Sequence, residues 1–129
     1  MTHRELGRAI GLSANAAGAR LQRLITNGVI SGFRAEVNHM ALGRPIEVTI
    51  DLWLNDYHER EPLTALVADD ARVVECFHLT GPLDFRLRAR VASTDDLNDL
   101  LNRFRDQGGV RQTDSRLVLE HIPTLGEPV

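Results

Sequence analysis

Four polar side chains near the N-terminus have the chemistry to contact a nucleic acid. The amides of Asn15 and Gln22 can read the hydrogen-bonding edges of bases, and the cations of Arg20 and Arg23 can bind phosphate oxygens or guanine. In a helix over this segment, small and polar residues lie opposite an apolar stripe formed by Ala17, Leu21, Leu24 and Ile25. The candidate DNA-contacting residues of this helix are therefore Asn15, Ala16, Ala19, Arg20, Gln22 and Arg23.

No set of residues has the spacing of a catalytic or metal site. The five histidines show no metal-ligand spacing, and the sequence has no glycine-rich phosphate loop. Cys76 and His78 lie two apart on an expected strand and face the same way, which would allow a thiol–imidazole pair. No third group is identifiable that would orient such a pair, so packing in a core or interface is the favoured interpretation. We expect no catalytic residues, no metal and no cofactor.

The composition is that of a soluble globular protein. The chain has 129 residues, of which 43% are hydrophobic and 26% charged. No apolar run approaches the roughly eighteen residues of a membrane span, and the first residues lack the apolar region of a signal peptide. The single cysteine, Cys76, excludes an internal disulfide and fits a reducing compartment. We therefore expect a cytoplasmic protein without a membrane partner.

Charge is distributed unevenly along the chain. Residues 1–44 contain six arginines and two acidic residues, a net charge of +4, whereas residues 45–129 contain nine arginines and sixteen acidic residues, a net charge of −7. A basic segment joined to an acidic body is typical of a separate anion-binding module. Chance asymmetry in a short segment is the alternative.

The N-terminal third has helix-turn-helix spacing. Thr2 has capping-box spacing and begins a first expected helix that runs to about Ile10, and Gly11 then permits a sharp turn. Ser13 is a good N-cap for the second helix, which residues 27–28 end. This order is that of a DNA-binding helix-turn-helix, although most helical hairpins bind no DNA. Two short strands are expected to follow, at residues 29–30 and 33–37.

The remaining two thirds alternate between strand and helix patterns. Strands are predicted at residues 46–54, 72–80, 85–91 and 112–122, and helices begin near Pro62 and at Ser93. The resulting order is βαββαβ, the ferredoxin-like arrangement of an α+β fold, in which both helices cover one face of an antiparallel sheet.

The other face of this sheet is expected to carry paired charges. Strands 46–54 and 85–91 are central neighbours in this topology, so Glu47 and Asp51 can pair with the alternating arginines of the second strand, which include Arg90. Trp53 shares this face, and an exposed tryptophan among paired charges indicates a subunit interface rather than a solvated ladder of charges. The candidate dimer-interface residues are Trp53, Arg86 and Arg88.

Five stretches of the sequence resemble the Lrp/AsnC, or feast/famine, family of regulators. They are residues 11–13, 20–24, 28–33, 42–43 and 75–85, and they occur in the family's order and spacing. The resemblance implies a partial winged helix-turn-helix joined to a βαββαβ domain that binds a ligand. It further implies homodimers that often assemble into octamers, and amino acids or related metabolites bound where dimers meet.

The resemblance also implies roles for individual residues. Ser13, Asn15, Ala16, Arg20 and Arg23 would lie on or beside a recognition helix that binds double-stranded DNA. The residues expected to border the effector pocket are Thr80, Gly81 and Asp84. A glycine lets a backbone amide approach a ligand closely, and a carboxylate can accept hydrogen bonds from an α-ammonium group. The alternative is that Gly81 and Asp84 only form a tight turn, with Asp84 capping its own loop.

The sequence departs from the family pattern in two places. Members carry a further helix before the one expected near Thr2, so the helix-turn-helix is expected to be incomplete, and Pro82 lacks an amide that could hold a ligand. The expected organisation is an incomplete DNA-binding region (1–32), a linker strand (33–44) and an effector-binding and oligomerisation domain (45–129).

The favoured function is that of a DNA-binding transcriptional regulator that responds to an amino acid or related metabolite. One alternative is an effector-binding oligomerisation module without DNA affinity. The other is an enzyme similar to the sirohaem decarboxylases, although the His- and Tyr-bearing motif of that branch is not evident ahead of residues 50–54.

Overall fold

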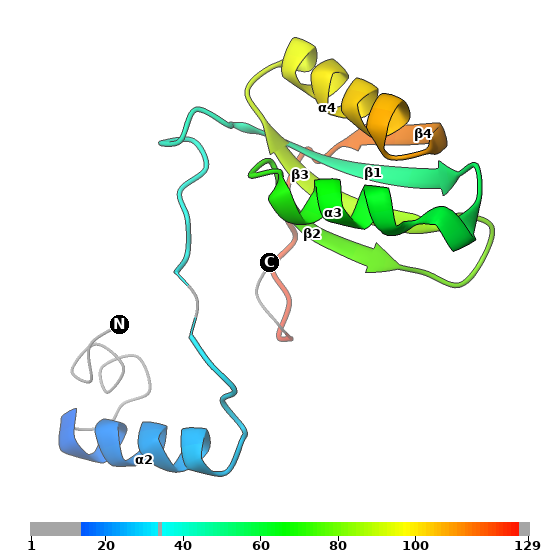
Figure 1. Ribbon diagram of the computed structural model, residues 1–129. Coiled ribbons are helices and arrows are strands. Elements are labelled where there is room, and N and C mark those ends of the chain that lie inside the picture. The colour runs from blue at the N-terminus through cyan, green and yellow to red at the C-terminus, as the bar shows by residue number, and fades with distance from the viewer. Residues whose placement is uncertain (1–13, 34, 127–129) are drawn as a thin grey trace. The chain divides into compact units, whose positions relative to one another are not determined.

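The computed structural model describes residues 14–33 and 35–126, and the chain divides into two compact units, residues 1–37 and 38–129 (Figure 1). The predicted first helix, its glycine turn and the Ser13 cap lie outside the described residues. None of the helices in the described ranges is long and apolar enough to cross a membrane.

The N-terminal unit contains helix α2 (Ala14–Thr26), which confirms the second predicted helix. Ala17 is fully buried, and Leu21 and Leu24 are partly buried, as the apolar stripe predicts. Ile25 is 38% exposed and therefore lies outside the buried stripe. The helix ends as predicted, because Gly28 adopts a φ of 75°, a conformation that glycine tolerates and side chains disfavour.

The prediction of strands at residues 29–30 and 33–37 is wrong for the residues that the structure describes there. The amide of Ile30 instead donates a hydrogen bond to the carbonyl of Leu24, which folds the chain back on the end of α2. Val29 and Phe33 are 70% and 68% exposed. A short alternating pattern forms a strand only where a neighbouring strand supplies hydrogen bonds, and no strand among residues 14–33 and 35–126 pairs with this segment.

The C-terminal unit has the predicted βαββαβ order. Its elements are β1 (Ile46–Leu54), the 3-10 helix η1 (Tyr57–Glu59), α3 (Glu61–Asp69), β2 (Val73–His78), β3 (Phe85–Val91), α4 (Thr94–Gln107) and β4 (Val110–Leu117). The strands form one antiparallel sheet in the order β2-β3-β1-β4, so β1 and β3 are the predicted central neighbours. Both α-helices lie on the same face of the sheet (Figure 1).

The predicted ends of the outer strands need correction. β4 begins at Val110 and ends at Leu117, not at residues 112 and 122, and β2 is shorter than residues 72–80. Among the described strands, β4 pairs with β1 alone, whose first residue follows Pro45. The amide of Val118 makes the last bond between them, to the carbonyl of Glu47. β4 therefore ends where its antiparallel partner β1 begins.

The two helices begin with the signals that the sequence predicts. Pro62 lies in the first turn of α3, where its missing amide costs no hydrogen bond. The Ser93 hydroxyl accepts a bond from the amide of Asp96 at the start of α4, and the Asp96 carboxylate accepts one from the amide of Ala92. These reciprocal bonds satisfy amides that have no partner within the helix.

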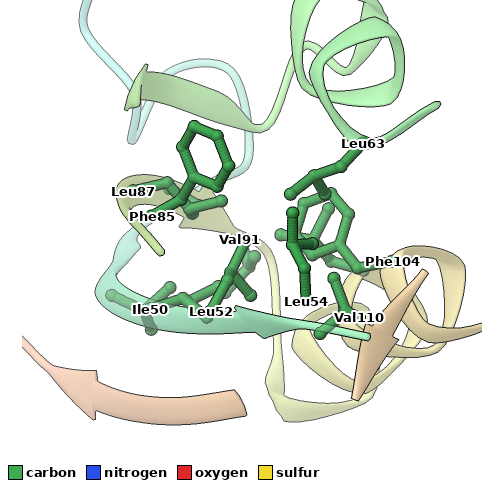
Figure 2. Close-up of a cluster of buried hydrophobic side chains, with 12 residues drawn as sticks. Ile50, Leu52, Leu54, Leu63, Phe85, Leu87, Val91, Phe104 and Val110 are labelled. Carbon is green, nitrogen blue, oxygen red and sulfur yellow. The ribbon is translucent and has the colours of Figure 1, made fainter. Parts of the chain in front are cut away.

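The hydrophobic core fills the space between the sheet and the helices (Figure 2). Alternate residues of β1 and β3 point into it, and Leu63 of α3 and Leu100 and Phe104 of α4 close it from the other side. Since side chains of a strand alternate between faces, the remaining residues of β1 and β3 must lie on the face opposite α3 and α4.

A buried carboxylate, Asp70, joins α3, β2 and α4. The Asp70 side chain is only 4% exposed and accepts bonds from Arg72 at 2.9 and 3.0 Å and from Arg103 of α4 at 2.8 Å. The bonds from Arg72 outweigh the effect of burial and lower the pKa of Asp70 to about 2. The carboxylate therefore stabilises the folded state when it is ionised.

The substitution Asp70→Asn should destabilise the chain by about 2 kcal/mol at pH 7, given about 1.4 kcal/mol for each unit of pKa difference. Because folding depresses this pKa, the stabilisation is complete above the unfolded value near pH 4 and is lost as the pH falls towards 2. Urea unfolding of both proteins at several pH values should show the difference shrinking over that interval. Asp106→Asn, at an exposed position of α4, is the matched control, and a pH-independent difference would contradict the assignment.

Candidate functional site

Two acidic residues are buried on the face of the sheet that the helices leave open. Glu47 and Asp51 of β1 are each only 5% exposed. The Nε and Nη2 atoms of Arg86 donate to the two carboxylate oxygens of Asp51, at 2.6 and 3.1 Å, and Arg116 of β4 approaches to 3.5 Å. The bonds from Arg86 outweigh the effect of burial and lower the pKa of Asp51. This pairing of charges across the strands confirms the prediction from the topology.

Glu47 forms the centre of a second cluster. Arg88 donates to Glu47 at 2.8 Å and to Glu75 of β2 at 2.8 Å, and His121 contacts the other oxygen of Glu47. Burial raises the pKa of Glu47, but the bonds from Arg88 and His121 outweigh it and the pKa is lowered. His121 follows β4, so the segment after this strand lies against the beginning of β1. The predicted partner Arg90 lies farther away, with 3.9 Å between charged groups.

The open face also carries the predicted interface residues. The Arg86 side chain is 47% exposed, the Arg88 side chain is 22% exposed, and Trp53 is partly exposed. Trp53 lies opposite Gln112 of β4, beyond the last residue pair between β1 and β3. Phe77 of β2 was missed by the sequence analysis; it is 49% exposed and lies opposite Arg86 on the same face. The face therefore combines paired charges with two accessible aromatic rings.

The loop between β2 and β3 contains the predicted effector residues. Thr80 and Gly81 are exposed, and Gly81 has a φ of 107°, which L-amino acids rarely adopt. A Cβ atom at Gly81 would meet nothing within 4 Å, so the backbone conformation and not crowding requires glycine there. The space above this residue is open.

Asp84 connects this loop to the end of β1. Its carboxylate accepts a bond from the amide of Leu54 at 2.8 Å, and its own amide donates to the carbonyl of Leu52 at 3.0 Å. Its carbonyl accepts from the amide of Leu79 at 3.3 Å, which closes the loop. The Asp84 side chain therefore caps the end of β1, whereas the alternative given above had it capping its own loop; the bond within the loop is made by the Asp84 backbone. One carboxylate oxygen takes part in these bonds.

Asp84→Ala should accelerate hydrogen exchange of the Leu54 amide by about tenfold or more, because a hydrogen bond to a charged acceptor contributes about 1.5–3 kcal/mol. Asp84→Asn keeps an acceptor oxygen and should restore most of the protection. Exchange measured by NMR or mass spectrometry would report both variants, with the amide of Val118, which bonds to Glu47 at the other end of β1, as the internal control. Unchanged exchange at Leu54 in the alanine variant would contradict the tether.

The predicted DNA-contacting residues lie along α2. Ala16, Ala19, Arg20, Gln22 and Arg23 are all exposed, and Asn15 lies in the first turn, whereas Ser13 lies outside the described residues. Within the described residues no acidic side chain forms an ion pair with Arg20 or Arg23. The charge of both guanidinium groups is therefore not neutralised by that part of the chain.

An aromatic cluster that the sequence analysis missed lies at the end of the sheet. The ring of Tyr57 in η1 stacks on His78 of β2 at 4.9 Å, its hydroxyl lies 3.3 Å from Nδ1 of His78, and Phe85 lies 5.3 Å from His78. The thiol–imidazole pair of Cys76 and His78 that the sequence would allow is not formed. His78 has Tyr57 as its partner, and burial raises the pKa of the Cys76 thiol. No group of potential metal ligands occurs in the described part of the chain.

Comparison with known proteins identifies the C-terminal unit. Residues 48–125 match the family model of the Lrp/AsnC ligand-binding domain. The HTH-type transcriptional regulator LrpA of Mycobacterium tuberculosis is 32% identical over 126 residues, which cover 92% of this chain and 83% of that relative.

Solved structures give the same result. A transcriptional regulator of Neisseria meningitidis in complex with L-Met has a TM-score of 0.77 and 25% identity, and the match covers 99% of this chain and 85% of the other. A feast or famine regulatory protein of M. tuberculosis complexed with L-methionine has a TM-score of 0.72 and 30% identity, with 96% and 84% covered. The chain therefore belongs to the Lrp/AsnC family of transcriptional regulators.

Proposed function

We propose that this chain regulates transcription by binding double-stranded DNA through α2 and by binding an amino acid or related metabolite in its C-terminal unit. The observation that carries the proposal is the match of residues 48–125 to a ligand-binding domain, in a chain that also presents an exposed, basic helix ahead of that domain. Two similar structures contain L-methionine, which supports an amino acid as the effector. The relatives are regulators from bacteria and archaea, which supports a cytoplasmic location as the corresponding proposal.

The relatives are regulators, and membership of this family makes the chain a regulator rather than an enzyme. This assignment removes the decarboxylase alternative. The module without DNA affinity is disfavoured by α2, because a helix that served only for packing would not need two exposed arginines without carboxylate partners in the described part of the chain.

DNA binding requires that α2 bring cations and amides to a duplex. Ala16 and Ala19 are exposed and small, so they allow the helix backbone to come close to base edges. Arg20 and Arg23 are long enough to reach phosphates, and Gln22, at the other edge of the exposed face from Arg20, has an amide that can pair with adenine. We propose that Ser13 and Asn15 contribute at the N-terminal end of the same surface.

Arg20→Ala and Arg23→Ala should each weaken binding to a 30-base-pair duplex of arbitrary sequence and reduce the slope of log K against log salt by about 0.9 for each phosphate that the variant no longer neutralises. Fluorescence anisotropy at several salt concentrations would measure both quantities. Arg105→Ala, at an exposed position of α4, should leave both unchanged. Identical salt slopes for wild type and both α2 variants would exclude this helix as the DNA-binding surface.

We also propose that two copies of the chain associate through the open faces of their sheets. Trp53 and Phe77 supply apolar area, and the half-exposed guanidinium of Arg86, which is held by Asp51, can also pair with an acidic group across a two-fold axis. Arg88, which is held by Glu47 and Glu75, would keep the face rigid. We further propose that such dimers assemble into octamers.

Trp53→Ala and Phe77→Ala should each weaken the dimer by about thirtyfold, since a central aromatic anchor in an interface contributes about 2 kcal/mol or more. Phe33→Ala removes an aromatic ring that is 68% exposed in the other unit and should leave the mass unchanged. Analytical ultracentrifugation of the full chain over a range of concentrations would give the dissociation constants. A monomeric wild-type chain, or dimers of equal strength in all three variants, would contradict this interface.

The β2–β3 loop is our proposed place for the polar end of the effector. Thr80 and Gly81 expose their backbone, and Asp84 has a second carboxylate oxygen beside the one that accepts from Leu54. An α-ammonium group could bind at that oxygen, with the loop amides directed to a carboxylate.

A further inference from the structure

The chain enters β1 through a turn that is docked on the sheet. This linker turn, residues 39–43, belongs to the C-terminal unit (Figure 1). The amide of Arg44 donates to the carbonyl of His39 at 2.9 Å and closes the turn. Arg90 of β3 then donates through its Nε and Nη2 atoms to the carbonyls of Arg44 and Pro45, both at 3.2 Å. A side chain of β3 therefore holds the backbone that joins the linker turn to β1.

His39 lies in this turn with one ring nitrogen unsatisfied. Its Nδ1 atom is shielded from solvent, and no residue in the ranges 14–33 and 35–126 forms a hydrogen bond with it. The charges that act on the ring most strongly belong to Arg90, Arg88, Glu47 and Arg44. Three of these four groups are cations. The imidazole therefore lies among charges that disfavour its protonated form.

Glu47, the one acid among these four groups, is already engaged by other partners. One of its oxygens accepts from Arg88 at 2.8 Å, and His121 of the segment after β4 contacts the other. Arg88 also holds Glu75 of β2 at 2.8 Å, so the nearby acid of that strand is paired as well. A proton on His39 would therefore add a positive charge that neither carboxylate is free to compensate, and it would repel the arginines.

Burial of the ring and the surrounding charges act in the same direction. Burial has the largest effect in lowering the pKa of His39 below its usual value of 6.5, and Arg90 and Arg88 follow. Glu47 raises this pKa, but by less than either arginine lowers it. The docked turn therefore favours the neutral imidazole. A ring that has left the sheet regains its ordinary pKa, so protonation and docking oppose each other.

We propose that His39 makes the docking of the linker turn depend on pH, and that acidification releases the turn from the sheet. Above about pH 6.5 the imidazole is neutral in both states and docking is at full strength. As the pH falls below that value the released state takes up a proton, and docking weakens until the docked ring is protonated too. Each unit of difference between the two pKa values lowers the docking equilibrium about tenfold. Histidine suits this role because it titrates near neutral pH.

The released segment is the connection between the two units. The N-terminal unit ends at Val37 and β1 begins at Ile46, so residues 38–45 can span up to about 25 Å once they are extended. A longer flexible connection lowers the effective concentration of one linked unit beside another. Acidification therefore loosens the connection between the unit that carries α2 and the C-terminal unit. This regulation goes beyond the proposed function and requires neither bound DNA nor effector.

The test is hydrogen exchange of the full chain by mass spectrometry between about pH 5 and pH 8, with exchange times rescaled for the chemical rate at each pH. The amide of Arg44 reports the linker turn, and that of Asn55, at the other end of β1, is the internal control. His39→Gln removes the titrating ring. His58→Gln changes an exposed histidine of η1 and is the matched control, and His121→Gln tests the contact of the tail.

We expect the protection of the Arg44 amide to fall about threefold or more from pH 8 to pH 5, because threefold corresponds to a pKa lowered by half a unit. Protection of Asn55 should stay constant. The pH dependence should vanish in His39→Gln and persist in His58→Gln and His121→Gln. Constant protection of Arg44 in the wild type, or a pH dependence that survives in His39→Gln, would overturn the proposal.

A second measurement needs no variant. Deuterium exchange at the C2 carbon of the imidazole gives the pKa of His39 in the wild-type chain, and a value below 6.5 is expected. A value at or above 6.5 would overturn the proposal even if the turn responds to pH. Loss of the pH dependence in His121→Gln alone would assign it to the tail and exclude His39. The DNA measurements are independent of all these outcomes.

Discussion

The antiparallel register between β1 and β3 is the constraint on which the rest of the C-terminal unit depends. It places Ile50 opposite Leu87 on the helix side and Asp51 opposite Arg86 on the open side. A slip of one residue would turn the arginines into the core and the apolar residues towards solvent. The core and the charge clusters therefore favour the same register between β1 and β3. The core disfavours registers that would expose its apolar residues, and the charge clusters disfavour registers that would separate the paired charges.

The elements of the fold that could be predicted are those whose residue pattern is complete within one segment of the chain. β1 and β3 alternate between apolar and charged residues along their whole length, and the structure places their ends where the pattern ends. The end of β4 could not be predicted, because it depends on where β1 begins. The prediction of strands after Gly28 fails because it too depends on a partner: the pattern is short, and no strand in the described part of the chain pairs with it.

The same distinction applies to the candidate sites. The pairing of Asp51 with Arg86 follows from the topology, so the sequence could predict it. The bond between Asp84 and the amide of Leu54 joins residues 30 apart, and the contact between Tyr57 and His78 joins residues 21 apart. Neither leaves a periodic pattern in the sequence. Both lie where β1, η1 and the β2–β3 loop come together, and the amide of Asn55 adds a bond to the carbonyl of Gly109 in the turn before β4. This end of the sheet is therefore continuous in its hydrogen bonding.

Glu47 is buried and shares its two oxygens between Arg88 and His121, two residues that lie far apart in the chain. Loss of either partner leaves part of a buried charge without compensation, and loss of Glu47 removes one of the two carboxylates that hold Arg88. Replacement at one of these positions is therefore tolerated best when the others change with it. Divergence within the family is accordingly expected to preserve or to exchange this trio as a unit, so that substitutions at residues 47, 88 and 121 are correlated across homologous sequences.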